Sequence, residues 1–130
     1  MSTTALTLED FEKTVTEDGI VLVDFWAEWC GPCRMFGPIF EKASEQHPDI
    51  VFGKVDTEAE QQLAAMAQIT SIPTLMAFRD GIGVFAQAGA LPAPALDSLI
   101  EQIRALDMDD VRAQVAEAEE HGQHAPGAEV

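Results

Sequence analysis

Cys30 and Cys33 are the only cysteines in the 130-residue chain, and two residues separate them. Thiols at this spacing can form a disulfide with each other or bind a metal as a pair. The apolar run of residues 20–27 predicts a strand before them, and the pattern of residues 33–47 predicts a helix after them. At such a junction the helix dipole and unpaired backbone N–H groups favour thiolate over thiol. The thiolate is the nucleophile, so we expect a reactive pair that faces the surface.

The composition is typical of one globular domain but contains a large excess of acidic residues. The chain has 23 Asp and Glu residues against seven Lys and Arg residues, a formal net charge of −16. Nucleic acids and anionic membrane surfaces are bound by basic patches, so this charge argues against both as partners. No apolar run approaches the ~20 residues of a membrane span, and the first residues lack a secretory signal pattern. We therefore expect a cytoplasmic protein, in which a lone cysteine pair is more often catalytic or metal-binding than structural.

The other elements follow from periodicity and turn residues. Thr7 is expected to cap a first helix and Thr57 a later one, and Asp80-Gly81 is expected to form a two-residue hairpin turn. Pro38 removes a backbone hydrogen bond inside the helix after the cysteines and predicts a kink there. The patterns predict strands over residues 20–26, 50–55, 74–79 and 82–87 and helices over residues 33–47, 58–67 and 93–106.

The composition changes after Leu106. We expect residues 1–106 to form one domain and residues 107–130 to form an acidic extension. Within the extension, a thin apolar stripe predicts a short helix at about 109–120, and the residues after it are expected to be disordered.

Several motifs together resemble the thioredoxin family over about residues 6–106. The main one is the run Val-Asp-Phe-Trp-Ala-Glu-Trp-Cys-Gly-Pro-Cys at residues 23–33. The others are Lys54-Val55-Asp56, Ile72-Pro73-Thr74, Phe78-Arg79-Asp80-Gly81 and Gly89-Ala90. The resemblance implies an α/β thioredoxin fold, with a central mixed sheet flanked by helices on both faces and the short C-terminal helix as an addition. It also implies a protein-disulfide reductase that holds no cofactor or metal.

The resemblance implies roles for individual residues as well. Cys30 would attack a substrate disulfide, and Cys33 would resolve the mixed disulfide. Asp24 would act as the general base for Cys33, with Lys54 modulating it, and Pro73 would be a cis proline opposite the cysteines. Trp26 and Pro38 would be structural residues near the site. An apolar docking surface for an extended peptide would consist of Trp29, Gly31, Pro32, Ile72, Gly89 and Ala90.

Asp24 is the exception in an otherwise apolar strand. Burial disfavours the ionised carboxylate and is expected to raise its pKa, while a neighbouring Lys54 would lower it again. A purely structural acid paired with Lys54 is the alternative interpretation, and the two roles are compatible.

Three other functions remain open at this point. A disulfide oxidase or isomerase would share the fold, but the Gly31-Pro32 dipeptide has no histidine to stabilise the thiolate, which favours a reductant. A zinc site could combine the cysteines with His121 and His124, and a non-catalytic binding partner or holdase would not need the thiols. For the favoured reductase we expect a monomer whose partners are disulfide-containing proteins and a flavin- and NADPH-dependent thioredoxin reductase.

Overall fold

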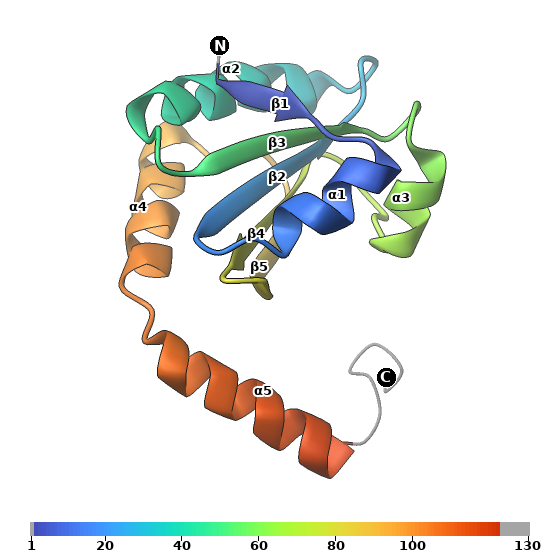
Figure 1. Ribbon diagram of the computed structural model, residues 1–130. Helices are drawn as coiled ribbons and strands as arrows, with labels where there is room; N and C mark the ends of the chain where they lie inside the picture. The colour runs from blue at the N-terminus through green and yellow to red at the C-terminus, as the bar shows by residue number, and fades with distance from the viewer. Residues whose placement is uncertain (1, 123–130) are drawn as a thin grey trace.

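A computed structural model describes residues 2–122, which form one five-stranded sheet between two layers of helices (Figure 1). The strand order is β1-β3-β2-β4-β5. The pairings of β3 with β1 and β2 are parallel, and those of β4 with β2 and β5 are antiparallel. The sheet is therefore mixed, as predicted. The strands are β1 (Thr3–Ala5), β2 (Ile20–Trp26), β3 (Val51–Asp56), β4 (Thr74–Arg79) and β5 (Ile82–Ala88).

The helices cover both faces of the sheet, and a further helix follows them at the C-terminus (Figure 1). They are α1 (Leu8–Val15), α2 (Gly31–Gln46), α3 (Gln61–Met66), α4 (Ala93–Arg104) and α5 (Met108–Gly122). The thioredoxin fold expected from the sequence is confirmed in these elements. The tail predicted to be disordered comprises residues 122–130: Gly122 instead ends α5, and residues 123–130 lie outside the described part of the chain.

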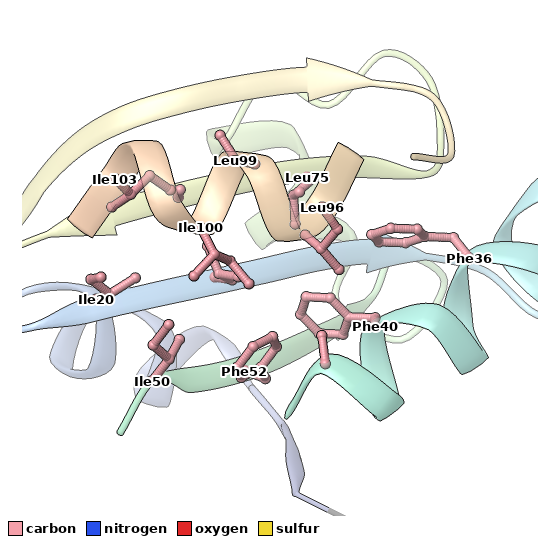
Figure 2. Packing of buried hydrophobic residues seen from close by; sticks show 13 residues of the cluster. Ile20, Phe36, Phe40, Ile50, Phe52, Leu75, Leu96, Leu99, Ile100 and Ile103 are labelled. Carbon is pink, nitrogen blue, oxygen red and sulfur yellow. The ribbon is translucent and has the colours of Figure 1, made fainter. Parts of the chain in front are cut away.

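The central strand β2 is buried on both faces because its side chains alternate between two apolar clusters. Ile20 and Leu22 pack with residues of α2 and α4, whereas Val21 and Val23 pack with residues of α1 and α3. Figure 2 shows the first cluster, in which the rings of Phe40 and Phe52 lie 5.1 Å apart between α2 and β3. Burying each such side chain contributes about 1.5–3 kcal/mol, so the strand that carries Asp24 is held rigidly.

The β4–β5 hairpin has the predicted two-residue turn. Asp80 and Gly81 both have positive φ, 53° and 83°, which Gly adopts freely and Asp tolerates. The Gly19 N–H donates to Asp80 Oδ1 at 2.8 Å, and the Asp80 N–H donates to the Gly19 carbonyl at 2.9 Å. These bonds fasten the turn to the start of β2.

Three details differ from the sequence prediction. Strand β1 was not predicted, because three residues of Thr and Ala carry too little apolar pattern to stand out. Of the two expected caps, Thr7 does cap α1 and accepts a hydrogen bond from the Asp10 N–H at 3.3 Å. Thr57, in contrast, does not cap a helix, because α3 begins later, after Glu60. The last helix is longer than expected and continues to Gly122.

Candidate active site

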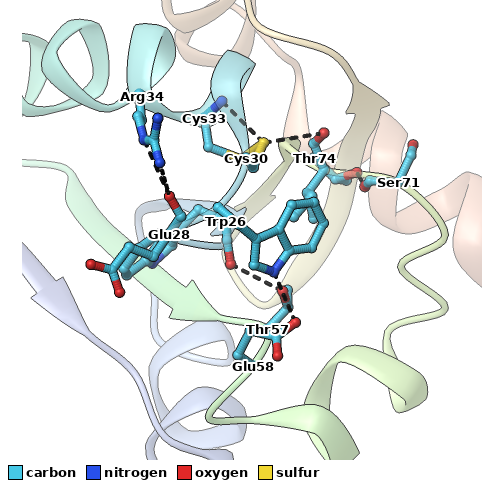
Figure 3. Close-up of a disulfide and its surroundings, with 11 residues drawn as sticks. Trp26, Glu28, Cys30, Cys33, Arg34, Thr57, Glu58, Ser71 and Thr74 are labelled. Atoms are coloured by element: carbon cyan, nitrogen blue, oxygen red, sulfur yellow. Dashed lines mark hydrogen bonds between the residues drawn. A yellow bond between two sulfur atoms is a disulfide. The ribbon is translucent and has the colours of Figure 1, made fainter.

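Cys30 and Cys33 are joined by a disulfide at the N-terminus of α2 (Figure 3). Cys30 is the N-cap residue, and its Sγ accepts a hydrogen bond from the Cys33 N–H at 3.1 Å. The helix begins with Gly31 and Pro32, and proline is well suited to a first turn because its missing N–H would have no partner there. A negative charge on Cys30 Sγ would thus meet a backbone donor and the positive end of the helix dipole.

The pair is less exposed than the sequence suggested. The relative exposure is 4% for Cys30 and 5% for Cys33, while the neighbouring Trp29 is 65% exposed. Ala27 and the half-buried Trp26 pack against the cysteines, so Trp26 is part of the support under the loop. The exposed surface beside the cysteines is therefore formed by Trp29 and by Gly31 and Pro32 of the first turn of α2.

Hydrogen bonds brace the loop between β2 and α2 from two sides. The Arg34 guanidinium donates to the Glu28 carbonyl at 3.0 and 3.2 Å (Figure 3). The Thr57 hydroxyl and N–H both donate to the Trp26 carbonyl, at 3.1 and 2.9 Å. These contacts fix the backbone of the loop at Trp26 and Glu28, just before Trp29 and Cys30.

Asp24 is almost completely buried, with 1% relative exposure. Neither of its carboxylate oxygens has a hydrogen-bond partner among the described residues. Burial raises the pKa of Asp24 to about 7, and the positive charge of Lys54 partly opposes that rise. The carboxyl is therefore poised to gain or lose a proton near neutral pH.

Cys33, Lys54 and Gly37 line an open cleft of about 430 Å³, together with Trp26 and Pro38. The Lys54 ammonium lies 5.0 Å from the centre of the Trp26 ring, a cation–π contact that holds the lysine at the cleft. Asp24 and Lys54 are direct partners in the register of β2 and β3, so the lysine charge acts on the carboxyl from the neighbouring strand.

The loop before β4 completes the site. The Ile72–Pro73 peptide bond is cis, and the Ile72 carbonyl oxygen lies 3.7 Å from Cys30 Sγ. The Gly89 N–H donates to the Pro73 carbonyl at 2.8 Å, which brings Gly89 and the adjoining Ala90 to this side of the molecule. Pro73 is buried, Ile72 is half-buried, and the other residues of the predicted docking surface are exposed.

Sequence reasoning missed one contact at the surface of the site. The Trp29 indole N–H donates to Glu58 Oε2 at 3.1 Å. Glu58 is one of many exposed acids in this chain, and it carries no motif signal. Only the turn after β3 brings it to the indole.

The comparisons with known proteins agree with this geometry. The thioredoxin family model matches residues 2–102. The chain belongs to the thioredoxin family. It is 61% identical over 116 residues to a Streptomyces coelicolor protein assigned as thioredoxin 2, covering 89% of this chain and 87% of the relative. It is also 40% identical over 93 residues to thioredoxin-1 of Saccharomyces cerevisiae, covering 72% and 90% of the two chains.

Solved structures show the same similarity in three dimensions. Plasmodium falciparum thioredoxin superimposes with a TM-score of 0.71 at 35% identity, covering 77% of this chain and 98% of that one. Malassezia sympodialis thioredoxin gives the same TM-score at 33% identity, covering 78% and 93%. The 116 residues aligned with the Streptomyces relative cannot fit within residues 1–106, so that similarity includes part of the segment after Leu106.

Family membership and the cysteine pair establish the general activity. The protein is a thiol–disulfide oxidoreductase of the thioredoxin family, with protein-disulfide reductase activity. Among the side chains that the structure describes, which end at residue 119, no group of three or more His, Cys, Asp or Glu residues could hold a metal ion. His121 and His124, which the zinc alternative would need, lie outside these side chains. In the described part of the chain, no helix is both long and apolar enough to cross a membrane.

Proposed function

We propose that the chain is a general cytoplasmic reductant of protein disulfides in which Cys30 attacks the substrate and Cys33 releases it. The supporting observation is the Cys33 N–H that donates to Cys30 Sγ at the N-terminus of α2. The bond is charge-assisted when the sulfur is a thiolate, so it stabilises the reactive form of Cys30 more than the thiol.

The reaction begins with the reduced protein. The Cys30 thiolate attacks one sulfur of the substrate disulfide, and the substrate S–S bond breaks as a Cys30–substrate disulfide forms. The second substrate sulfur leaves as a thiolate and takes up a proton. Cys33 then attacks Cys30 Sγ, which forms the Cys30–Cys33 disulfide and releases the first substrate sulfur. Two electrons and two protons pass to the substrate.

Asp24 takes the proton from Cys33 as that thiol becomes a nucleophile. A carboxyl with a pKa of about 7 can accept a proton and return it to solvent near neutral pH. Lys54 keeps that pKa from rising further, and the open cleft beside Cys33 connects the region to solvent. Desolvation and the lysine charge thus act in opposite directions on the same group.

The substrate would bind across Trp29, Gly31 and Pro32 on one side of the disulfide and Ile72, Gly89 and Ala90 on the other. The Ile72 backbone beside Cys30 offers hydrogen-bonding groups to an extended peptide, as in strand addition. Backbone pairing and a small apolar surface select little among sequences, so we expect many disulfide-containing proteins as substrates.

We further propose that the protein acts as a monomer without a bound cofactor. A flavin- and NADPH-dependent thioredoxin reductase would restore its dithiol. Residues 1–106 would be sufficient for this chemistry, with residues 107–130 as a separate extension.

A trapping experiment tests the order of attack. Cys33→Ser, reduced and mixed with a protein disulfide such as insulin, is expected to accumulate a Cys30–substrate adduct that mass spectrometry detects. Cys30→Ser is the matched control and is expected to form no adduct in the time that Cys33→Ser needs to accumulate one. Equal trapping by both variants, or faster trapping through Cys33, would overturn the assignment of the nucleophile.

A further inference from the structure

The start of β5 and the apolar stripe of α5 form the two walls of an open cleft of about 340 Å³. The strand contributes Ile82, Gly83 and Val84, and the helix contributes Val111, Gln114 and Val115. Figure 1 shows α5 leaving the end of α4 and running past the β4–β5 hairpin. The cleft lies at the end of the sheet remote from Cys30, because β5 starts at the turn and reaches the site only at Ala88.

The base of α5 is held firmly in place. The Arg79 guanidinium donates to the carbonyls of Ile103, Arg104 and Leu106, at 2.7, 3.1 and 3.1 Å. Met108, the first residue of α5, is buried with 6% relative exposure. These contacts hold the start of α5 against the rest of the domain and so position the helix wall of the cleft.

The outer part of the stripe remains open to solvent. Val115 is among the exposed large hydrophobic residues, at 37% relative exposure. Arg112 lies 3.9 Å from Asp80 of the turn and ties the first two turns of α5 to the hairpin. An apolar wall that is held in place by the fold but exposed to solvent is suited to contact with another chain.

The other wall offers backbone hydrogen-bonding groups. Strand β5 is the last strand of the five-stranded sheet, so alternate N–H and C=O groups point away from β4. Gly83, which has only backbone atoms, is one of the residues that line the cleft, so the cleft reaches the backbone of β5. A glycine at a strand edge permits the close approach of a second backbone. The occupant that matches this wall is an extended peptide segment.

The acidic residues of α5 determine which kind of extended segment fits the cleft. Asp110 precedes Val111, Glu117 is three residues beyond Gln114, and Glu119 is four residues beyond Val115, so acids flank the stripe on both sides. The single arginine of α5, Arg112, is already occupied by Asp80 and Asp109. Basic side chains on the occupant would lie between these acids, while its small apolar side chains would face the stripe.

We propose that the cleft between β5 and α5 binds an extended, basic segment of a partner protein, which adds as a strand to the edge of β5 under the cover of α5. The proposal gives the acidic extension a binding role that is separate from disulfide chemistry. Because Cys30 is at the other end of the sheet, a partner bound here leaves the active site free.

The test uses the full-length protein and a defined probe, an acetylated and amidated heptapeptide of alternating lysine and valine. Its binding is followed by the backbone amide signals in NMR spectra. We expect the largest shift changes at Ile82, Gly83, Val84 and the cleft-facing residues of α5, with affinity that falls as salt is added. Two control peptides separate the forces: glutamate in place of lysine removes the charge match, and N-methylation of alternate residues blocks strand pairing. Both are expected to bind at least about tenfold more weakly.

Two matched variants locate the contact. Val115→Lys puts a charge in the apolar wall and is expected to weaken binding by about tenfold or more. Ala113→Lys adds the same charge on the opposite side of α5 and is expected to change binding less than about twofold. Insulin reduction is expected to be unchanged in both. The proposal is overturned if the probe does not bind, which would mean that α5 only shields the strand edge. It is also overturned if the N-methylated peptide binds equally well, or if both variants weaken binding alike.

Discussion

The polar side chains at the two ends of strand β4 differ in whether they have hydrogen-bond partners. At the active-site end, the neighbouring Asp24 is buried with no hydrogen-bond partner for either oxygen among the described residues. At the far end, the Arg79 guanidinium donates to three backbone carbonyls and lies 3.9 Å from Asp80. Buried polar groups are normally hydrogen-bonded, so the carboxyl without a partner costs stability, and this cost fits the role that we propose for Asp24 in the reaction. The hydrogen-bonded guanidinium marks a structural joint.

The largest predicted effect on stability comes from removing the charge of Asp24. The folded state holds a proton up to a pH of about 7, whereas the unfolded chain releases it near 3.9. The folded state therefore binds more protons in this window, and the free energy of unfolding falls as the pH rises through it, by roughly 4 kcal/mol at most. Asp24→Asn is expected to be more stable than the original protein by about 2–4 kcal/mol at pH 8, with the difference disappearing near pH 4.

Urea unfolding at both pH values measures this prediction. Glu12→Gln is the control, because Glu12 is exposed on α1 and its charge makes no comparable difference to folding. A gain for Asp24→Asn that is equal at pH 4 and pH 8 would contradict an ionisation-linked penalty.

The opposite end is expected to respond in the opposite direction. Arg79→Met leaves the carbonyls at the end of α4 without their donor, and we expect a loss of about 2–3 kcal/mol in the free energy of unfolding. Arg112→Met, which removes only an exposed arginine on α5, is expected to lose less than about 1 kcal/mol. Thermal or urea unfolding of both variants checks the ranking. Equal losses would show that Arg79 is not the joint between the sheet and the last two helices.

Lys54 provides a finer test of the acid at the site. Its charge lowers the pKa of Asp24, so Lys54→Met is expected to raise that pKa above about 7. The carboxyl carbon of Asp24, followed by NMR through a pH titration, reports the value directly. Lys42→Met on the exposed face of α2 is expected to leave the titration unchanged. An unchanged pKa of Asp24 in Lys54→Met would mean that the two groups are not electrostatically coupled, and a lowered one would also contradict the prediction.

The smallest predicted effect on stability is at the exposed surface of the site. Trp29→Phe removes the indole N–H that donates to Glu58, and both partners are exposed, so we expect a loss below about 1 kcal/mol. The same variant is expected to reduce a protein disulfide several-fold more slowly but a small-molecule disulfide at an unchanged rate, since only the protein substrate needs the docking surface. Stopped-flow assays with both substrates separate the two effects. If neither rate changes, Trp29 does not contact protein substrates.

Much of the active site could be predicted because its signals are local in sequence. The cysteine pair, the apolar strand before it and the single acid within that strand all lie in residues 20–33. Periodicity predicted β2, α2 and α4 because each buries a continuous apolar stripe. The contacts of Glu58 and Arg79 could not be predicted, since each joins residues far apart in the sequence and an exposed acid or an arginine has no distinctive pattern. Strand β1 forms because it pairs with β3. This tertiary contact cannot be predicted from the three residues of β1 alone.

The measurement that tests the proposed reductase function most directly is the equilibrium reduction potential of the Cys30–Cys33 pair in a glutathione buffer. A dithiol with glycine and proline between the cysteines is expected to give a value below about −230 mV, which is that of a reductant. About 30 mV corresponds to about 1.4 kcal/mol for this two-electron couple, so the distinction is well within experimental reach. A value between about −180 and −120 mV would contradict the account and indicate a disulfide isomerase or oxidase.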